Sequence, residues 1–128
     1  MLQDSKAYSS FAVKDIAASK AFYEQLGAKA EPMMGGSLLD LTLPGGGPHV
    51  MVYQKEDHQP ATFTVLSFPV SDVDVAVGQL TAAGIEMARF DGFDQDDKGI
   101  SRGGEGPTIA WFRDPSGNIL AVHSNEGM

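Results

Sequence analysis

The sequence contains no cysteine and little positive charge. Without cysteine there can be no disulfide, no thiolate nucleophile and no thiolate ligand for a metal. Nine lysines and arginines stand against 17 acidic residues, so the formal net charge is −8. A surface of this sign repels the phosphate backbone of nucleic acids, and we expect no nucleic-acid partner. The same charge attracts cationic ligands or serves only to keep the protein soluble.

A long apolar run is also missing. No stretch approaches the roughly 20 apolar residues that cross a bilayer, and residues 1–6 hold no apolar core of signal-peptide length. We therefore expect a cytoplasmic protein without a membrane partner. The chain has 128 residues, of which 42% are hydrophobic, and this is the size and composition of one domain with a real core. We expect a single domain over residues 1–128.

An internal repeat organises the chain. The segment FAVKDI at residues 11–16 recurs as FPVSDV at residues 68–73, which is an offset of 57 residues. The same offset relates Gly27 to Gly84. A fixed internal period indicates one supersecondary unit used twice. We place the first module at about residues 1–60 and the second at about residues 61–128.

Each copy begins with the same pattern of local structure. Alternating residues predict a strand, and the aspartate after it, Asp15 or Asp72, is suited to cap a helix N-terminus. Apolar residues at helical spacing follow, and Gly27 or Gly84 stands where a left-handed residue would end the helix. Both modules are therefore predicted to open with a strand and a helix.

Three strands are predicted after each helix. In the first copy they lie around Met33 and at residues 38–43 and 49–54, and in the second at 86–89, 108–113 and 118–124. Pro115 and Gly117 favour a tight turn between the last two strands. For the polar segment 91–106 three interpretations stay open, namely a lid, an acidic rim and an exposed flexible loop. Each module thus reads βαβββ.

The motifs together resemble one known superfamily. They are FAVKD at 11–15, AFYEQLG at 21–27, VSD at 70–72, AG at 83–84 and FRDPSGN at 112–118, and they cover nearly the whole chain. The sequence is similar to the vicinal-oxygen-chelate proteins, which include glyoxalase I, extradiol dioxygenases, fosfomycin-modifying enzymes and bleomycin-binding proteins. The resemblance implies an α+β fold in which the curved mixed sheets of two βαβββ modules form a barrel-like cup with the helices outside. It also implies a small-molecule ligand and a homodimer.

The resemblance further implies where catalytic members hold a divalent metal. The corresponding positions carry Tyr8, Met51, Val65 and Ala121. This set cannot replace imidazole and carboxylate ligands. The same alignment that identifies the fold therefore disfavours glyoxalase I or extradiol dioxygenase activity, and we expect no cofactor.

A displaced metal site is the alternative. His49 and His123 stand two residues from Met51 and Ala121, so each would share the inward face of its strand. Glu56 or His58 could supply a third ligand. Both histidines could equally lie at strand ends in contact with water.

Strand alternation predicts the lining of the cup. Trp111 is expected opposite Ala121 in the closing hairpin, with Arg113 on the same face. An aromatic, apolar and sparsely polar lining is typical of small-molecule pockets. Large residues such as Tyr8, Met51 and Trp111 could instead fill the interior as packing. The candidate ligand-binding residues are Tyr8, Ser10, Met51, Tyr53, Ser67, Trp111, Arg113, Ala121 and His123.

Two functions from different classes follow. The first is a metal-free protein that binds a cationic or aromatic small molecule. The second is an enzyme with a displaced metal or an acid–base site, for which His49 and His123 are the candidate catalytic residues, with Tyr8 and Tyr53 beside them. A vestigial site in a domain that serves only for interaction is a third possibility.

Overall fold

The computed structural model describes residues 1–104 and 106–126. The chain divides into two compact units, residues 1–60 and 61–128. The boundary falls where the repeat places the end of the first module. Each unit is described by itself, and the expectation of a single domain over residues 1–128 stays a prediction.

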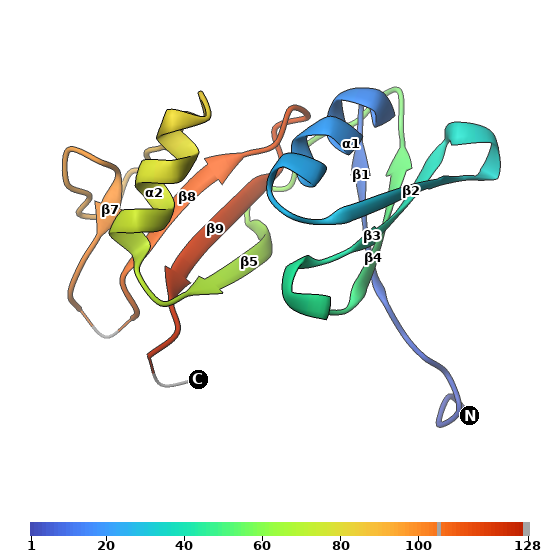
Figure 1. The fold of residues 1–128 in the computed structure, drawn as a ribbon, viewed down its shortest axis with the longest axis horizontal. Coiled ribbons are helices and arrows are strands. Elements are labelled where there is room, and N and C mark those ends of the chain that lie inside the picture. The colour runs from blue at the N-terminus through green and yellow to red at the C-terminus, as the bar shows by residue number, and fades with distance from the viewer. Residues whose placement is uncertain (105, 127–128) are drawn as a thin grey trace. The chain divides into compact units, whose positions relative to one another are not determined.

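The first unit is a four-stranded mixed sheet with one helix (Figure 1). Two 3₁₀ turns, Met34–Gly36 and Pro44–Gly46, stand before and after the third strand. The sheet order is β1-β4-β3-β2, with β1 parallel to β4 and the other pairs antiparallel. Its elements are β1 (Ser9–Val13), α1 (Ile16–Gln25), β2 (Lys29–Met33), β3 (Leu38–Thr42) and β4 (His49–Gln54).

The second unit repeats this plan with one strand added. The sheet order is β5-β9-β8-β6, with β5 parallel to β9. The strand β7 lies off this order and pairs with β8. Its elements are β5 (Thr64–Val70), α2 (Val73–Ala82), β6 (Met87–Ala88), β7 (Ile100–Ser101), β8 (Ile109–Arg113) and β9 (Ile119–Ser124).

Both helices begin and end as the repeat predicts. Adding 57 to either bound of α1 gives the bound of α2. The Asp15 carboxylate accepts the Ala18 N–H at 3.0 Å, and Asp72 accepts that of Val75 at 3.1 Å. Such caps satisfy N–H groups that have no partner within the helix. Gly27 has φ +104° and Gly84 has φ +86°, the left-handed conformation that ends a helix.

One face of each sheet packs against its own helix. In the first unit, Tyr23 of α1 is fully buried and its ring lies 6.0 Å from that of Phe11 on β1. In the second unit, α2 lies against β8 and β9, where Phe112 and Leu120 are buried. This burial removes one set of alternate residues from water and leaves the opposite set as the other face of each sheet.

The α+β class and the two modules with curved mixed sheets are confirmed. The count of three strands after the second helix is corrected, because β7 lies inside the segment taken as a polar loop. Ile100 is buried and pairs with Ala110. A two-residue strand is too short to show a sequence period, so only its pairing with β8 in the structure reveals β7.

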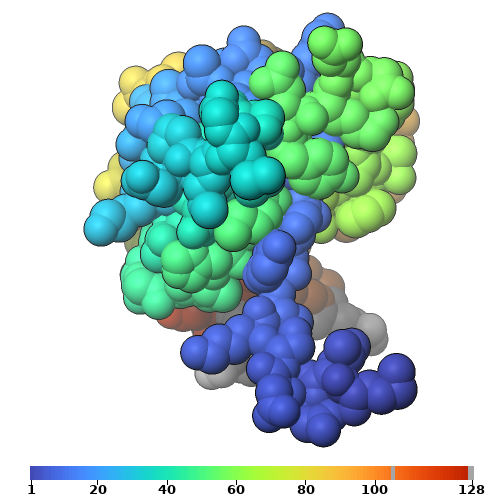
Figure 2. Space-filling view, turned by 90° about the vertical axis from the view of Figure 1, so that its right-hand side faces the viewer, coloured from blue at the N-terminus to red at the C-terminus, as the bar shows by residue number. Residues whose placement is uncertain are grey.

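The N-terminal segment and the character of the helices complete the description of the fold. The N-terminal segment before β1 is exposed and projects from the first unit as the blue arm of Figure 2. No helix in the described residues is long and apolar enough to cross a membrane.

Candidate functional site

The face of the first sheet opposite α1 carries the predicted residues of that module. The register pairs Ser10 with Met51 and Ala12 with Tyr53, which places them on the face opposite Val52. Tyr53 is 42% exposed and Met51 is half-buried. Tyr8 precedes β1 and is 60% exposed. The first sheet therefore offers Ser10, Met51 and Tyr53 together on one surface, with Tyr8 at its margin.

His49 on this face has a partner that the sequence alone did not reveal. Its Nδ1 lies 2.6 Å from Oδ1 of Asp40 on the neighbouring strand β3. A carboxylate can only accept a hydrogen bond, so Nδ1 carries the proton and Nε2 is the acceptor of the neutral ring. The pair lies diagonally across two strands, a contact that needs the antiparallel register of β3 and β4.

The corresponding face of the second sheet is organised around Trp111. Ser67, Ala121, Trp111 and Ala88 form one row across β5, β9, β8 and β6. Trp111 and Ala121 are paired, as the sequence predicts. Within the row, Ser67 is exposed, whereas Trp111, Ala121 and Ala88 are buried.

Two further predicted residues flank this row. Arg113 pairs with Ile119, and His123 pairs with both Pro69 and Ile109. Arg113 is exposed and His123 is half-buried, with its Nδ1 2.8 Å from the Ser124 carbonyl oxygen. Ser67, Trp111, Arg113, Ala121 and His123 therefore share one face of the second sheet.

Two phenylalanines that sequence reasoning missed complete the Trp111 surroundings. The ring centroid of Phe93 lies 4.6 Å from that of Trp111, and the Phe90 centroid lies 5.7 Å away at an angle of 88°. The Arg113 guanidinium lies 5.1 Å from the Phe90 centroid, within the range of a cation–π contact. The only available sequence signal was the presence of two aromatic residues around an acidic stretch, and that signal does not say which strand they meet.

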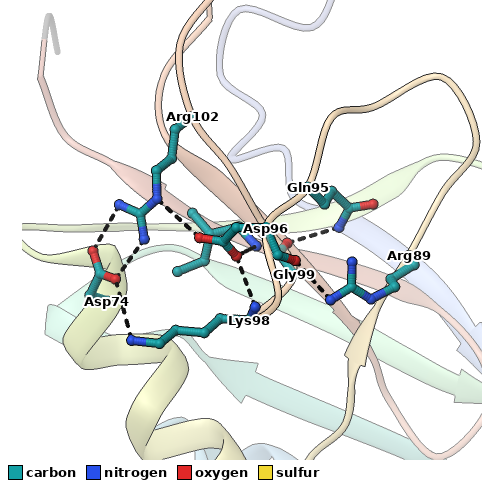
Figure 3. A network of polar contacts seen from close by, with 8 residues as sticks. Asp74, Arg89, Gln95, Asp96, Lys98, Gly99 and Arg102 are labelled. Carbon is teal, nitrogen blue, oxygen red and sulfur yellow. Dashed lines mark hydrogen bonds and ion pairs between the residues drawn. The ribbon is translucent and has the colours of Figure 1, made fainter.

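The segment 91–106 is anchored through its described part, as Figure 3 shows. One Asp96 oxygen accepts the N–H groups of Lys98 and Ile100, both at 2.9 Å. The other accepts Arg102 Nε at 3.1 Å, and Arg102 also binds both oxygens of Asp74 on α2, at 3.0 and 2.6 Å. Of the three interpretations of this segment, the exposed flexible loop is therefore the one that residues 95–102 do not fit.

These contacts shift the pKa values of the exposed groups involved. The hydrogen bond from Arg102 lowers the pKa of Asp74 below its usual range. Hydrogen bonding from the Ile100 N–H, with a further contribution from Arg102, lowers the pKa of Asp96. The Asp74 and Asp96 carboxylates raise the pKa of Arg102. All three groups are charged at neutral pH, so the network is a set of ion pairs.

The residues at the family's metal positions do not fit a divalent metal. Met51, Val65 and Ala121 offer no hard oxygen or imidazole donor, and Val65 lies at a register irregularity of β5. In the described part of the chain, no three His, Asp or Glu side chains are grouped so that they could hold a metal ion. The absence of a cofactor remains a prediction, because only analysis of the purified protein tests it.

The displaced metal site gains no support from its other members. His49 engages Asp40, while His123 belongs to the second sheet. Glu56 is exposed, and His58 Nε2 is buried without a hydrogen-bond partner among the described residues. Among the described residues, these candidates therefore form no group that could hold a metal ion.

A separate hollow of about 630 Å³ lies on the second unit. Val77 and Gly78 of α2 line one wall, and Met87, Arg89 and Lys98 line the other. None of the predicted ligand-binding residues contributes to it.

Comparison with known proteins identifies the family. Residues 7–122 match the Glyoxalase/Bleomycin resistance protein/Dioxygenase superfamily. This match spans most of the chain, so the protein belongs to that superfamily. No curated protein matches the sequence closely enough to count as a relative.

Solved structures support the same fold. A fosfomycin resistance protein from Listeria monocytogenes shares 16% identity with a TM-score of 0.72, over 94% of this chain and 93% of that one. A bleomycin resistance determinant encoded on transposon Tn5 shares 20% identity with a TM-score of 0.64, over 94% and 98%. An antibiotic-binding protein from a Streptomyces species shares 20% identity with a TM-score of 0.62, over 93% and 95%. At these identities the likeness establishes the fold alone.

Proposed function

We propose that the protein is a metal-free small-molecule-binding member of its superfamily and that its ligand is a cationic or aromatic compound. The observation that carries this proposal is the Trp111 row on the second sheet. Ser67, Arg113 and His123 surround an aromatic platform there, while Ala121 occupies the position where catalytic relatives would hold a metal ligand. The site thus has groups suited to stacking and hydrogen bonding, and Ala121 offers no donor to a metal ion.

Two further facts support binding over catalysis. The net charge of −8 favours cationic ligands. The fold is also that of a bleomycin resistance determinant and of an antibiotic-binding protein. We propose by analogy that the protein sequesters its ligand, in the cytoplasm and as a homodimer of the 13.6 kDa chain.

The fluorescence of Trp111 tests the proposal directly, because it is the only tryptophan in the chain. We expect saturable quenching by at least one compound in a panel of cationic antibiotics and aromatic cations. Arg113→Gln should change the affinity for that compound, whereas Lys20→Gln, a cation on α1 away from the candidate faces of both sheets, should not. A panel that produces no saturable quenching would leave the proposal without support.

Metal removal gives the second arm of the test. If binding is metal-free, treatment with EDTA should leave the quenching curve unchanged, and elemental analysis should find less than stoichiometric metal in the purified protein. Loss of binding after EDTA, restored by one divalent metal, would contradict this part of the proposal.

The pair of His49 and Asp40 favours an acid–base enzyme as the second candidate. A carboxylate that orients an imidazole, with Nε2 left to accept a proton, is the arrangement that a general base requires. If the protein turns over a panel compound, His49→Gln should reduce kcat at least about a hundredfold, with His58→Gln as the control. Unchanged turnover in the His49 variant would remove this candidate.

A further inference from the structure

Trp111 already has an aromatic partner supplied by its own chain. The 4.6 Å contact places the Phe93 ring against Trp111, within the usual range for aromatic pairs. Yet Phe93 remains 54% exposed, whereas Trp111 is only 7% exposed. Phe93 thus keeps about half of its surface in water, and burial stabilises its position less than that of a core residue.

Phe93 lies in the tip of its loop, residues 91–94, and the side chain of Gln95 bridges the residues on either side of this tip. Gln95 accepts the Phe90 N–H through Oε1 at 2.9 Å and donates through Nε2 to the carbonyl oxygens of Ala88 and Gly99, at 3.0 and 2.8 Å. Among the described residues, no side chain of residues 91–94 makes a hydrogen bond or ion pair, and Gly92, in the turn at 91–92, has φ +88°. No side-chain polar contact therefore holds the tip in place.

The residues that follow the tip are fixed. Asp96 holds the turn over residues 96–100, and Arg102 ties it to Asp74 on α2 (Figure 3). Arg89 donates to the Asp96 carbonyl oxygen at 2.8 Å. A hinge is thus defined between the anchored part, 95–102, and the tip, 91–94.

The charge of the tip indicates which ligand would displace it. Asp91 and Asp94 stand on either side of Gly92 and Phe93 in the sequence, and both are exposed. Neither forms an ion pair with another described residue. A positive ligand beside the Trp111 ring would gain the attraction of both carboxylates.

We propose that Phe93 is a built-in occupant of the stacking surface of Trp111. The ligand is a planar aromatic cation that takes the place of the Phe93 ring, with Asp91 and Asp94 beside its charge. This inference rests on the proposed function of the site. It adds that Phe93 sets a threshold for binding, because a ligand must stack on Trp111 better than Phe93 does.

Phe93→Ala tests the inference, with Phe63→Ala as its matched control. Phe63 belongs to the same unit, is 68% exposed and has no ring contact among the described residues. The probes are proflavine, a planar aromatic cation; 2-naphthol, its neutral counterpart; and spermidine, a cation without a ring. Binding is measured by calorimetry and by Trp111 emission.

Removing the ring should strengthen binding. An aromatic pair of ordinary strength corresponds to about a two- to tenfold gain in proflavine affinity when the competitor is deleted. The emission of the free Phe93→Ala protein should shift to the red, because water reaches Trp111. Phe63→Ala should leave both quantities at the wild-type value. The double variant Asp91→Asn, Asp94→Asn should weaken proflavine binding and leave 2-naphthol binding unchanged.

The outcomes separate this inference from the proposed function. If the wild-type protein binds proflavine and Phe93→Ala binds it no more tightly, Phe93 is not a competitor and the inference is overturned alone. Binding of spermidine as strongly as proflavine would overturn the aromatic requirement. If neither protein binds any cationic or aromatic compound, the proposed function is overturned and this inference falls with it.

Discussion

At the residue scale, two glycines of the second unit lie in opposite environments. Gly78 is inside α2, and a Cβ built there meets nothing within 4 Å. Gly99 has φ +84°, and a Cβ there would lie 3.1 Å from Met87 Cβ. Glycine is needed at the second position for both its conformation and its lack of volume, whereas at the first it only weakens the helix.

Alanine at these two positions should therefore act in opposite directions. We expect Gly78→Ala to raise the free energy of unfolding by up to about 1 kcal/mol. Gly99→Ala should lower it by more than about 1 kcal/mol, because a left-handed residue gains a side chain with a close neighbour. Urea denaturation of the two variants beside the wild type measures both effects. Shifts of the same sign would show that these local environments do not control stability.

At the element scale, the ion pairs that hold residues 95–102 make the position of the segment depend on pH. The folded pKa values of Asp74 and Asp96 are lowered, so their contribution is complete above the usual aspartate value of about 3.9 and is lost as pH falls through the folded values. Arg102 keeps its charge throughout this range, since its pKa is raised. Acid therefore removes the negative partners of the network.

Acidification below about pH 4 should release the segment and with it Phe93. We expect a red shift of Trp111 emission before global unfolding, and a smaller acid-induced shift in Asp74→Asn, which has already lost the bidentate contact with Arg102. Asp57→Asn is the matched control, because Asp57 is also exposed with a pKa lowered by an ion pair, to Lys55. Equal acid responses in the Asp74 variant and the wild type would show that the network does not position the tip.

At the scale of the whole molecule, net charge governs how a ligand approaches. The chain carries −8 at neutral pH, and this field acts over a Debye length of about 10 Å at 0.1 M salt. A cation is therefore attracted more strongly at low ionic strength than a neutral molecule of the same shape.

Proflavine affinity should fall several-fold as salt rises from about 20 to about 300 mM, because shorter Debye lengths screen the attraction. The affinity for 2-naphthol should change little over the same range. Calorimetric titrations at four salt concentrations measure both. Parallel salt dependences for the two compounds would mean that the negative charge plays no part in recognition.

Much of the fold was predictable because it depends on residues near one another in the chain. The aspartate caps, the glycine helix ends and the pairing of Trp111 with Ala121 all follow from short patterns. The repeat then predicted the succession of strand, helix and strands in each module, although it missed β7. The resemblance also located the positions where relatives hold a metal, so the unsuitable residues there could be read directly.

The site was only partly predictable. Alternation placed Ser10, Met51 and Tyr53 on one face, and Ser67, Trp111, Arg113, Ala121 and His123 on another. It also assigned Val65 to the face of Ser67, but a register irregularity between Thr64 and Leu66 interrupts the alternation at that residue. The roles of the candidate residues on these two faces in ligand binding remain predictions that the binding experiments decide.

The sequence by itself determined the two-module plan, the helix ends and the residues that alternate along each strand, since these are set by neighbours a few positions apart. Only the tertiary structure decided that Phe93 covers Trp111, that Asp40 binds His49 and that Arg102 joins Asp74 to Asp96. Each of these contacts joins side chains from different segments. Which segments meet depends on strand register and on the path of a loop, and neither leaves a periodic signal in the chain.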